Sequence, residues 1–79
     1  MPSIIDMKPG QTACVEAVTA GDDIRRRLVE MGILPGKSLR FVRTAPLGDP
    51  IEIDLDGCHI ALRKREARTV LVSMEGVRT

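Results

Sequence analysis

Residues 51–62 read I-E-I-D-L-D-G-C-H-I-A-L, two alternating apolar runs separated by Asp56-Gly57. A two-residue Asp-Gly loop between such runs is the strongest short-range signal for a β-hairpin. We therefore predict strands over Ile51–Leu55 and Cys58–Arg63. This hairpin is the element from which the rest of the fold can be built.

The turn also sets which residues of the two strands face each other. Three apolar pairs are expected on one face, which we predict to be the core: Leu55/Cys58, Ile53/Ile60 and Ile51/Leu62. On the opposite face Asp54 should lie across from His59, and Glu52 across from Ala61. We interpret His59 and Asp54 as an ordinary surface ion pair.

Upstream of the hairpin the sequence predicts one helix, over Asp22–Met31. Asp22 or Asp23 can accept hydrogen bonds from the free amides of the first turn. Gly32 follows the last turn, where a left-handed residue closes a helix without a Cβ penalty. Apolar residues recur at i, i+4 and i+7 and form one stripe: Ile24, Leu28 and Met31.

Three further strands are predicted, over Gln11–Val18, Ser38–Ala45 and Thr69–Met74, and residues 64–67 should form a single helical turn. Five short strands in so small a chain avoid bare edges by curling into a partly closed barrel. The predicted fold is therefore mainly β: a small five-stranded barrel with one α-helix between strands one and two. We expect one domain over residues 1–79, with its core at about 4–74 and a loose tail at 76–79.

Composition narrows the function classes. The formal charge is +1, and Phe41 is the one aromatic residue among Phe, Tyr and Trp. Modules that bind nucleic acid are usually more basic, and those that stack bases need aromatic faces. The N-terminus lacks a signal peptide pattern, and no apolar run approaches the ~20 residues that span a bilayer. We expect a cytoplasmic protein that neither binds nucleic acid nor inserts into a membrane.

The sequence shows no arranged metal or catalytic site. Cys58 and His59 are adjacent in a strand, so they should point to opposite faces, with Cys58 in the core. Cys14 has no neighbouring ligand in sequence, and the usual zinc ligand spacings are missing. No nucleophile motif or phosphate-binding loop is present. We predict no metal site, no cofactor and no enzymatic activity.

Two surface features stand out instead. Arg25-Arg26-Arg27 opens the predicted helix, where the helix dipole disfavours cations, and the loop 45–50 carries Leu47 between two prolines, which restrict it. A solvated charged face and a rigid hairpin tip are the simpler interpretations. The alternatives are that the arginines contact an acidic or phosphate-bearing partner surface, and that the loop is a docking knob.

Several motifs, taken in order, closely resemble the ferrous iron transport protein A (FeoA) family. They are Met7-Lys8-Pro9-Gly10, R-L-V-E-M-G-I-L-P-G at 27–36, A-P-L-G-D-P-I at 45–51, I-A-L-R at 60–63, and Glu66-Ala67. The resemblance implies an SH3-like barrel. It also implies a cytosolic accessory protein of ferrous iron uptake that acts on the membrane transporter FeoB, which bears a cytosolic GTPase domain.

The resulting hypothesis is an adaptor that regulates a FeoB-type transporter, with Arg25, Arg26, Leu47 and Asp49 as contact residues. The alternative is a metal-responsive module that weakly binds Fe²⁺ or another divalent metal through surface Asp, Glu or His59. An RNA-binding barrel is a third class, which the near-neutral charge disfavours. The sequence is also compatible with self-association.

Overall fold

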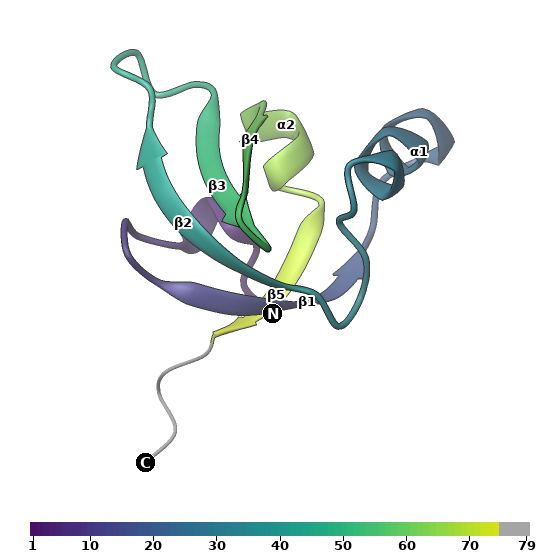
Figure 1. Ribbon diagram of the computed structural model, residues 1–79. Coiled ribbons are helices and arrows are strands. Elements are labelled where there is room, and N and C mark those ends of the chain that lie inside the picture. The colour runs from purple at the N-terminus through teal and green to yellow at the C-terminus, as the bar shows by residue number, and fades with distance from the viewer. Residues whose placement is uncertain (75–79) are drawn as a thin grey trace.

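Five antiparallel strands form one sheet in the order β4-β3-β2-β1-β5, and the sheet curls around the core (Figure 1). The computed structural model describes residues 1–74, so the predicted tail at 76–79 lies outside the described residues. The elements are a 3₁₀ helix η1 (Ile4–Asp6), β1 (Thr12–Val18), α1 (Asp22–Glu30), β2 (Ser38–Thr44), β3 (Ile51–Leu55), β4 (Cys58–Leu62), α2 (Lys64–Ala67) and β5 (Val70–Met74). The mainly β fold with one principal helix is confirmed.

The β3–β4 hairpin has the predicted register, with Leu55 opposite Cys58, Ile53 opposite Ile60 and Ile51 opposite Leu62. Its turn residues Asp56 and Gly57 have φ values of 52° and 84°. Two successive positive φ values are what a type I′ turn requires, and this turn matches the twist of the flanking strands. Local turn chemistry is therefore sufficient to align the two strands.

The prediction that Cys58 is a core residue is wrong, because its side chain is exposed. Cys58 does lie on the same face as Ile53, which is fully buried. However, β4 is the edge strand of the sheet, and Cys58 is its first residue, next to the turn. No element covers that end of the face within residues 1–74, so sharing the core face was not enough to bury the thiol.

Helix α1 begins differently from the prediction. Its N-cap is Gly21, and no side chain caps the first turn. Asp22 and Asp23 instead lie inside the first turn, where the positive end of the helix dipole favours a carboxylate. The prediction of an aspartate N-cap is therefore wrong by one residue.

The other end of α1 follows the prediction. Gly32 has a φ of 92°, and the amide of Ile33 donates a hydrogen bond of 2.9 Å to the carbonyl of Leu28. Leu28 and Ile33 are fully buried, while Ile24 and Met31 are half-buried against the core. The helix thus flanks the curled sheet and packs its apolar stripe against the core.

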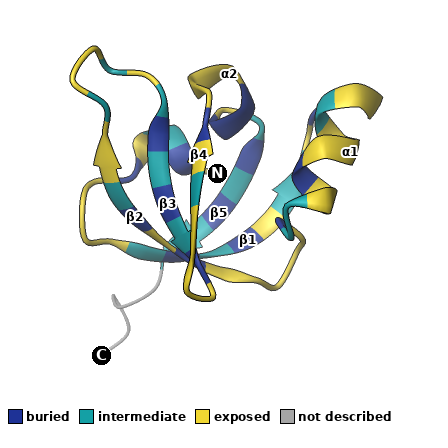
Figure 2. Cartoon of the chain, turned by 45° about the horizontal axis from the view of Figure 1, so that its top comes forward, coloured by how far each residue is buried: buried dark blue, intermediate teal, exposed yellow. Residues whose placement is uncertain are grey.

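Buried side chains of all five strands belong to one hydrophobic core, and Figure 2 colours the buried segments of the chain dark blue. Phe41, the single aromatic residue, belongs to this core. The described surface therefore carries no Phe, Tyr or Trp side chain on which a base could stack. Leu47 is the opposite case, an apolar side chain that is 97% exposed.

Candidate functional site

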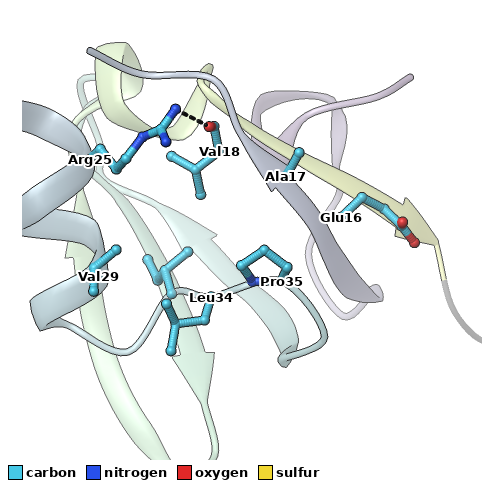
Figure 3. Close-up of a pocket in the computed structure, with 8 residues that line it drawn as sticks. Glu16, Ala17, Val18, Arg25, Val29, Leu34 and Pro35 are labelled. Carbon is cyan, nitrogen blue, oxygen red and sulfur yellow. Dashed lines mark hydrogen bonds between the residues drawn. The ribbon is translucent and has the colours of Figure 1, made fainter. Parts of the chain in front are cut away.

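A groove of about 310 Å³ lies between α1 and the second half of β1 (Figure 3). Its walls come from three segments: Glu16, Ala17 and Val18 of β1, Arg25 and Val29 of α1, and Ile33, Leu34 and Pro35 of the connection to β2. Val29 and Leu34 are exposed apolar residues on this surface. Exposed apolar side chains that line a concavity are typical of an interaction site.

The groove exists because β1 leaves β2 early. Pairing between β1 and β2 ends at Cys14 and Ser38, whereas pairing between β1 and β5 continues to Val18. Beyond Val15, the edge of β1 therefore faces α1 rather than another strand. The side chain of Arg25 donates a hydrogen bond of 3.2 Å from Nη2 to the carbonyl oxygen of Val18 (Figure 3). Arg25 thus bridges the two walls of the groove.

The three consecutive arginines of α1 have three different environments. Arg25 contacts β1, and Arg27 forms an ion pair with Glu66 of 3.2 Å between Nη1 and Oε2. The side chain of Arg26 is exposed and makes no hydrogen bond or ion pair with any residue of the described chain, 1–74. Of the three, Arg26 is therefore the cation that is available to a partner.

The burial of Glu66 and its pairing with Arg27 were not predicted from the sequence. Glu66 is a carboxylate with 2% exposure, and its Oε1 accepts a hydrogen bond of 2.9 Å from the amide of Arg63. Together with the Arg27 ion pair, this places one buried charge between α1 and the start of α2. A glutamate three residues after a helix start is a known capping pattern, and that spacing was the available signal.

The loop 45–50 is fastened to α2 by Asp49. Its Oδ1 accepts a hydrogen bond of 3.0 Å from the amide of Lys64, and its Oδ2 lies 3.9 Å from Nη1 of Arg63. Within the loop, the amide of Ala45 donates to the carbonyl of Pro50 at 2.9 Å. These bonds hold the loop in one shape and leave Leu47 projecting into solvent at its tip.

The predicted contact residues do not form a single patch. Figures 1 and 2 both show α1 on one side of α2, and the β2–β3 loop that carries Leu47 and Asp49 on the other side. Arg25 and Arg26 therefore belong to the α1 surface, and Leu47 belongs to a separate tip. A partner that touches both must reach across α2.

On the outer face of the hairpin, His59 pairs with Glu52 rather than with Asp54 as predicted. The distance from Nε2 to Oε1 is 2.9 Å. His59 is directly opposite Asp54, but Arg40, which faces Asp54 from β2, pairs with that carboxylate at 3.5 Å. His59 therefore reaches its diagonal neighbour, which is within range on an antiparallel sheet.

Glu52 accepts a second contact from Nη2 of Arg43 at 3.1 Å. Hydrogen bonds from Arg43, and secondarily from His59, lower the pKa of the Glu52 carboxyl below its ordinary value of 4.5. The outer face thus carries a small network of polar contacts in which exposed basic side chains meet the half-buried carboxylates of Glu52 and Asp54.

The donor groups of the described chain do not fit a metal site of three or more ligands. No group of three His, Cys, Asp or Glu side chains lies together within residues 1–74. In this part of the chain His59 and Glu52 are a pair without a third donor, and Cys14 and Cys58 are both free thiols. Within the same residues, no helix is long and apolar enough to cross a membrane.

Comparison with known proteins adds an independent line of observation. A family model described as the FeoA domain matches residues 3–74. The solution structure of the FeoA protein from Chlorobium tepidum is 35% identical, with a TM-score of 0.90 over 99% of this chain and 74% of that one. The likeness therefore extends over nearly the whole chain.

A second solved structure is the zinc complex of FeoA from Stenotrophomonas maltophilia. It is 32% identical and covers 92% of this chain and 91% of that one, with a TM-score of 0.81. That protein is described as a procaryotic SH3 domain protein and a candidate activating factor of bacterial ferrous iron transport. The predicted SH3-like fold is confirmed by this likeness.

A third relative is much longer than this chain. It is the Fe(2+) transport protein A/Fe(2+) transporter FeoB fusion protein of Porphyromonas gingivalis, which is 29% identical over 69 residues. The match covers 87% of this chain and 8% of the fusion protein. In that organism, a domain like this one and a transporter are parts of one polypeptide.

Proposed function

The chain belongs to the FeoA domain family of ferrous iron transport, and from this premise we propose that it is an accessory protein that binds the cytosolic portion of a FeoB-type Fe²⁺ transporter and regulates it. The fusion protein of Porphyromonas gingivalis carries the proposal. Domains that are joined in one organism are held at high effective concentration, and separate chains must replace that by direct binding.

Two surface features of the chain support binding rather than catalysis. The tip at Leu47 is an exposed apolar side chain on a loop held by Asp49. The α1 surface offers the apolar groove beside Val29 and the cation of Arg26, whose side chain has no partner among residues 1–74. A preorganised apolar anchor loses little entropy on binding, so Leu47 should contribute more affinity than its size alone would indicate.

The direct test is a calorimetric titration of the transporter's cytosolic GTPase domain with this chain, in the GDP-bound and GTP-bound states. We expect saturable binding that is weakened about tenfold or more by Leu47→Ser, since hot-spot truncations cost above ~1 kcal/mol. Arg26→Glu should weaken binding at low salt and lose its effect at high salt. Lys8→Glu reverses a charge outside these surfaces and serves as the matched control.

Two results would contradict the proposal. One is no heat of binding at high micromolar concentration with a chain that is folded by circular dichroism. The other is binding that Leu47→Ser and Lys8→Glu reduce equally, because the named surfaces would then be irrelevant.

The metal-responsive alternative draws on the zinc complex of the Stenotrophomonas maltophilia relative. In this chain its best candidate is the His59–Glu52 pair, which supplies two donors. Titration with Fe²⁺ under anaerobic conditions separates the two functions. Submillimolar binding that His59→Ala abolishes would favour a metal-responsive module over an adaptor.

A further inference from the structure

The two edges of the sheet are treated differently by the rest of the chain. At β5, Ser3 forms a β-bridge with Leu71, and the amide of Val72 donates a hydrogen bond of 2.8 Å to the carbonyl of Pro2. The N-terminal segment therefore covers this edge. At β4, no strand of residues 1–74 pairs with the side away from β3.

The unpaired groups of β4 can be identified from the turn. A two-residue hairpin loop makes Leu55 and Cys58 a hydrogen-bonded pair, and such pairs alternate along the ladder. The N–H and C=O groups of His59 and Ala61 must then point away from β3. Among residues 1–74, no group is hydrogen-bonded to these outward-pointing N–H and C=O groups.

The composition of β4 does not protect this edge. Natural edge strands are commonly guarded by charged residues or proline, but β4 reads C-H-I-A-L. The interior strands do carry charges, for example Glu16 in β1 and Arg40 in β2. The other edge strand, β5, also lacks charges, and it is the strand that the N-terminus covers. We therefore expect the uncharged edge of β4 to be paired as well.

We propose that the cover is a second copy of this chain, paired antiparallel through β4 about a two-fold axis at Ile60. In this register His59 of each copy faces Ala61 of the other. Both are residues with outward backbone groups, so two pairs exchange two hydrogen bonds each. The edge is therefore complementary to itself, as a two-fold interface requires.

The side chains agree with this register. Ile60, which is half-buried, meets Ile60 of the second copy on the core-facing side and gains cover there. His59 meets a small uncharged residue rather than another imidazole. Continued past the ends of β4, the same register sets Asp56, which pairs with Lys37 of its own copy at 3.4 Å, near the basic start of α2 in the other copy, at Lys64. Opposite charges then meet at both ends of the interface.

This proposal is independent of transporter binding, since it uses neither α1 nor the Leu47 loop. It predicts a concentration-dependent monomer–dimer equilibrium, measured by sedimentation equilibrium. Ala61→Pro should abolish the dimer, because it removes an outward N–H without breaking a bond to β3. If that variant fails to fold, Ala61→Lys tests the same edge by placing a charge on it.

Disulfide cross-linking tests the register. In a Cys14→Ser, Cys58→Ser background, Ile60→Cys should cross-link readily with oxidised glutathione, since a non-hydrogen-bonded pair has Cα atoms about 4.5 Å apart. His59→Cys and Ala61→Cys are the matched controls. Each would lie over ~8 Å from its own copy, which is beyond disulfide reach.

Selective cross-linking at position 60 and loss of the dimer in Ala61→Pro are the expected results. A chain that stays monomeric at about 1 mM, where even a weak interface would be half-formed, overturns the proposal. So does a dimer that Ala61→Pro and Ala61→Lys leave intact, or cross-linking that is equal at positions 59, 60 and 61.

Discussion

The β3–β4 hairpin and the junction between α1 and α2 are held together by different means. In the hairpin, a turn of two residues aligns strands that are neighbours in sequence. At the junction, Arg27 and Glu66 meet across a long stretch of chain, and one of them is a buried carboxylate. The first region depends on backbone conformation, and the second depends on pairing a buried charge.

The two regions should therefore respond differently to mutation. A turn residue changes stability through strain, which is local and limited to one backbone conformation. A buried charge changes it through the cost of desolvation, which is no longer offset when the partner is removed. Substitutions in the two regions can separate these effects, beginning with the junction, where the expected change is largest.

Arg27→Ala should lower the free energy of unfolding by about 2–3 kcal/mol, because it leaves the Glu66 carboxylate buried without its cation. The loss should be smaller than for a fully buried pair, since the Arg27 side chain is 57% exposed. Urea denaturation measures it. Arg26→Ala, one residue away and without an ion pair in the described chain, should stay within about 0.5 kcal/mol.

A second variant sharpens the assignment. In the Arg27→Ala background, Glu66→Gln should restore part of the lost stability, since the amide is neutral and still accepts from the Arg63 amide. Equal losses in Arg27→Ala and Arg26→Ala would show that the junction does not depend on the buried charge.

Gly57→Ala should lower the free energy of unfolding by about 1–2 kcal/mol, the cost of a left-handed conformation with a Cβ. The φ of Gly57 is 84°, and a Cβ added there would meet no atom within 4 Å, so the cost is conformational rather than steric crowding. Thermal unfolding measures the change. Asp56→Asn should be nearly neutral, because asparagine accepts a positive φ.

A hairpin that tolerated Gly57→Ala as well as Asp56→Asn would contradict the type I′ explanation of its register. The register itself can be checked in the same variants by cross-strand nuclear Overhauser contacts between Asp54 and His59.

The smallest effect is expected at the outer face of the hairpin and depends on pH. Because the pKa of Glu52 is lowered in the folded chain, its stabilising contribution is complete above its ordinary value of 4.5. The contribution is lost as the pH falls through the lower folded value. Glu52→Gln should therefore flatten the dependence of stability on pH below about 4.5, as measured by urea denaturation at several pH values.

Arg43→Ala provides the control, since Arg43 is the principal cause of the shift. It should move the acid limb of the profile toward higher pH without removing it. A profile that is identical in the parent chain and in Glu52→Gln would contradict this account.

Much of the fold could be predicted because its signals are local. All five strands and the principal helix end within one residue of their predicted bounds, and α2 matches its prediction at both ends. The hairpin register needed only the Asp56-Gly57 turn. The wrong predictions concern the environment of single residues. Cys58 is exposed because β4 is an edge strand, and His59 pairs with Glu52 because Arg40 pairs with Asp54.

The candidate site was predictable only in part. Leu47 stands out in the sequence and is exposed as expected, although its role in binding stays a prediction. The groove beside α1 could not be foreseen, because it depends on where β1 separates from β2. Asp49 was chosen as a contact residue, and the structure places its carboxylate against the start of α2.

The sequence by itself determined the turn, the alternation of the strands, the end of α1 at Gly32 and the family motifs, because each depends on residues close together in the chain. Only the tertiary structure decided which edge the N-terminus covers, which of three consecutive arginines has no side-chain partner in the described residues, and that Glu66 is buried. Those outcomes depend on which distant segments meet, and a linear pattern does not contain that information.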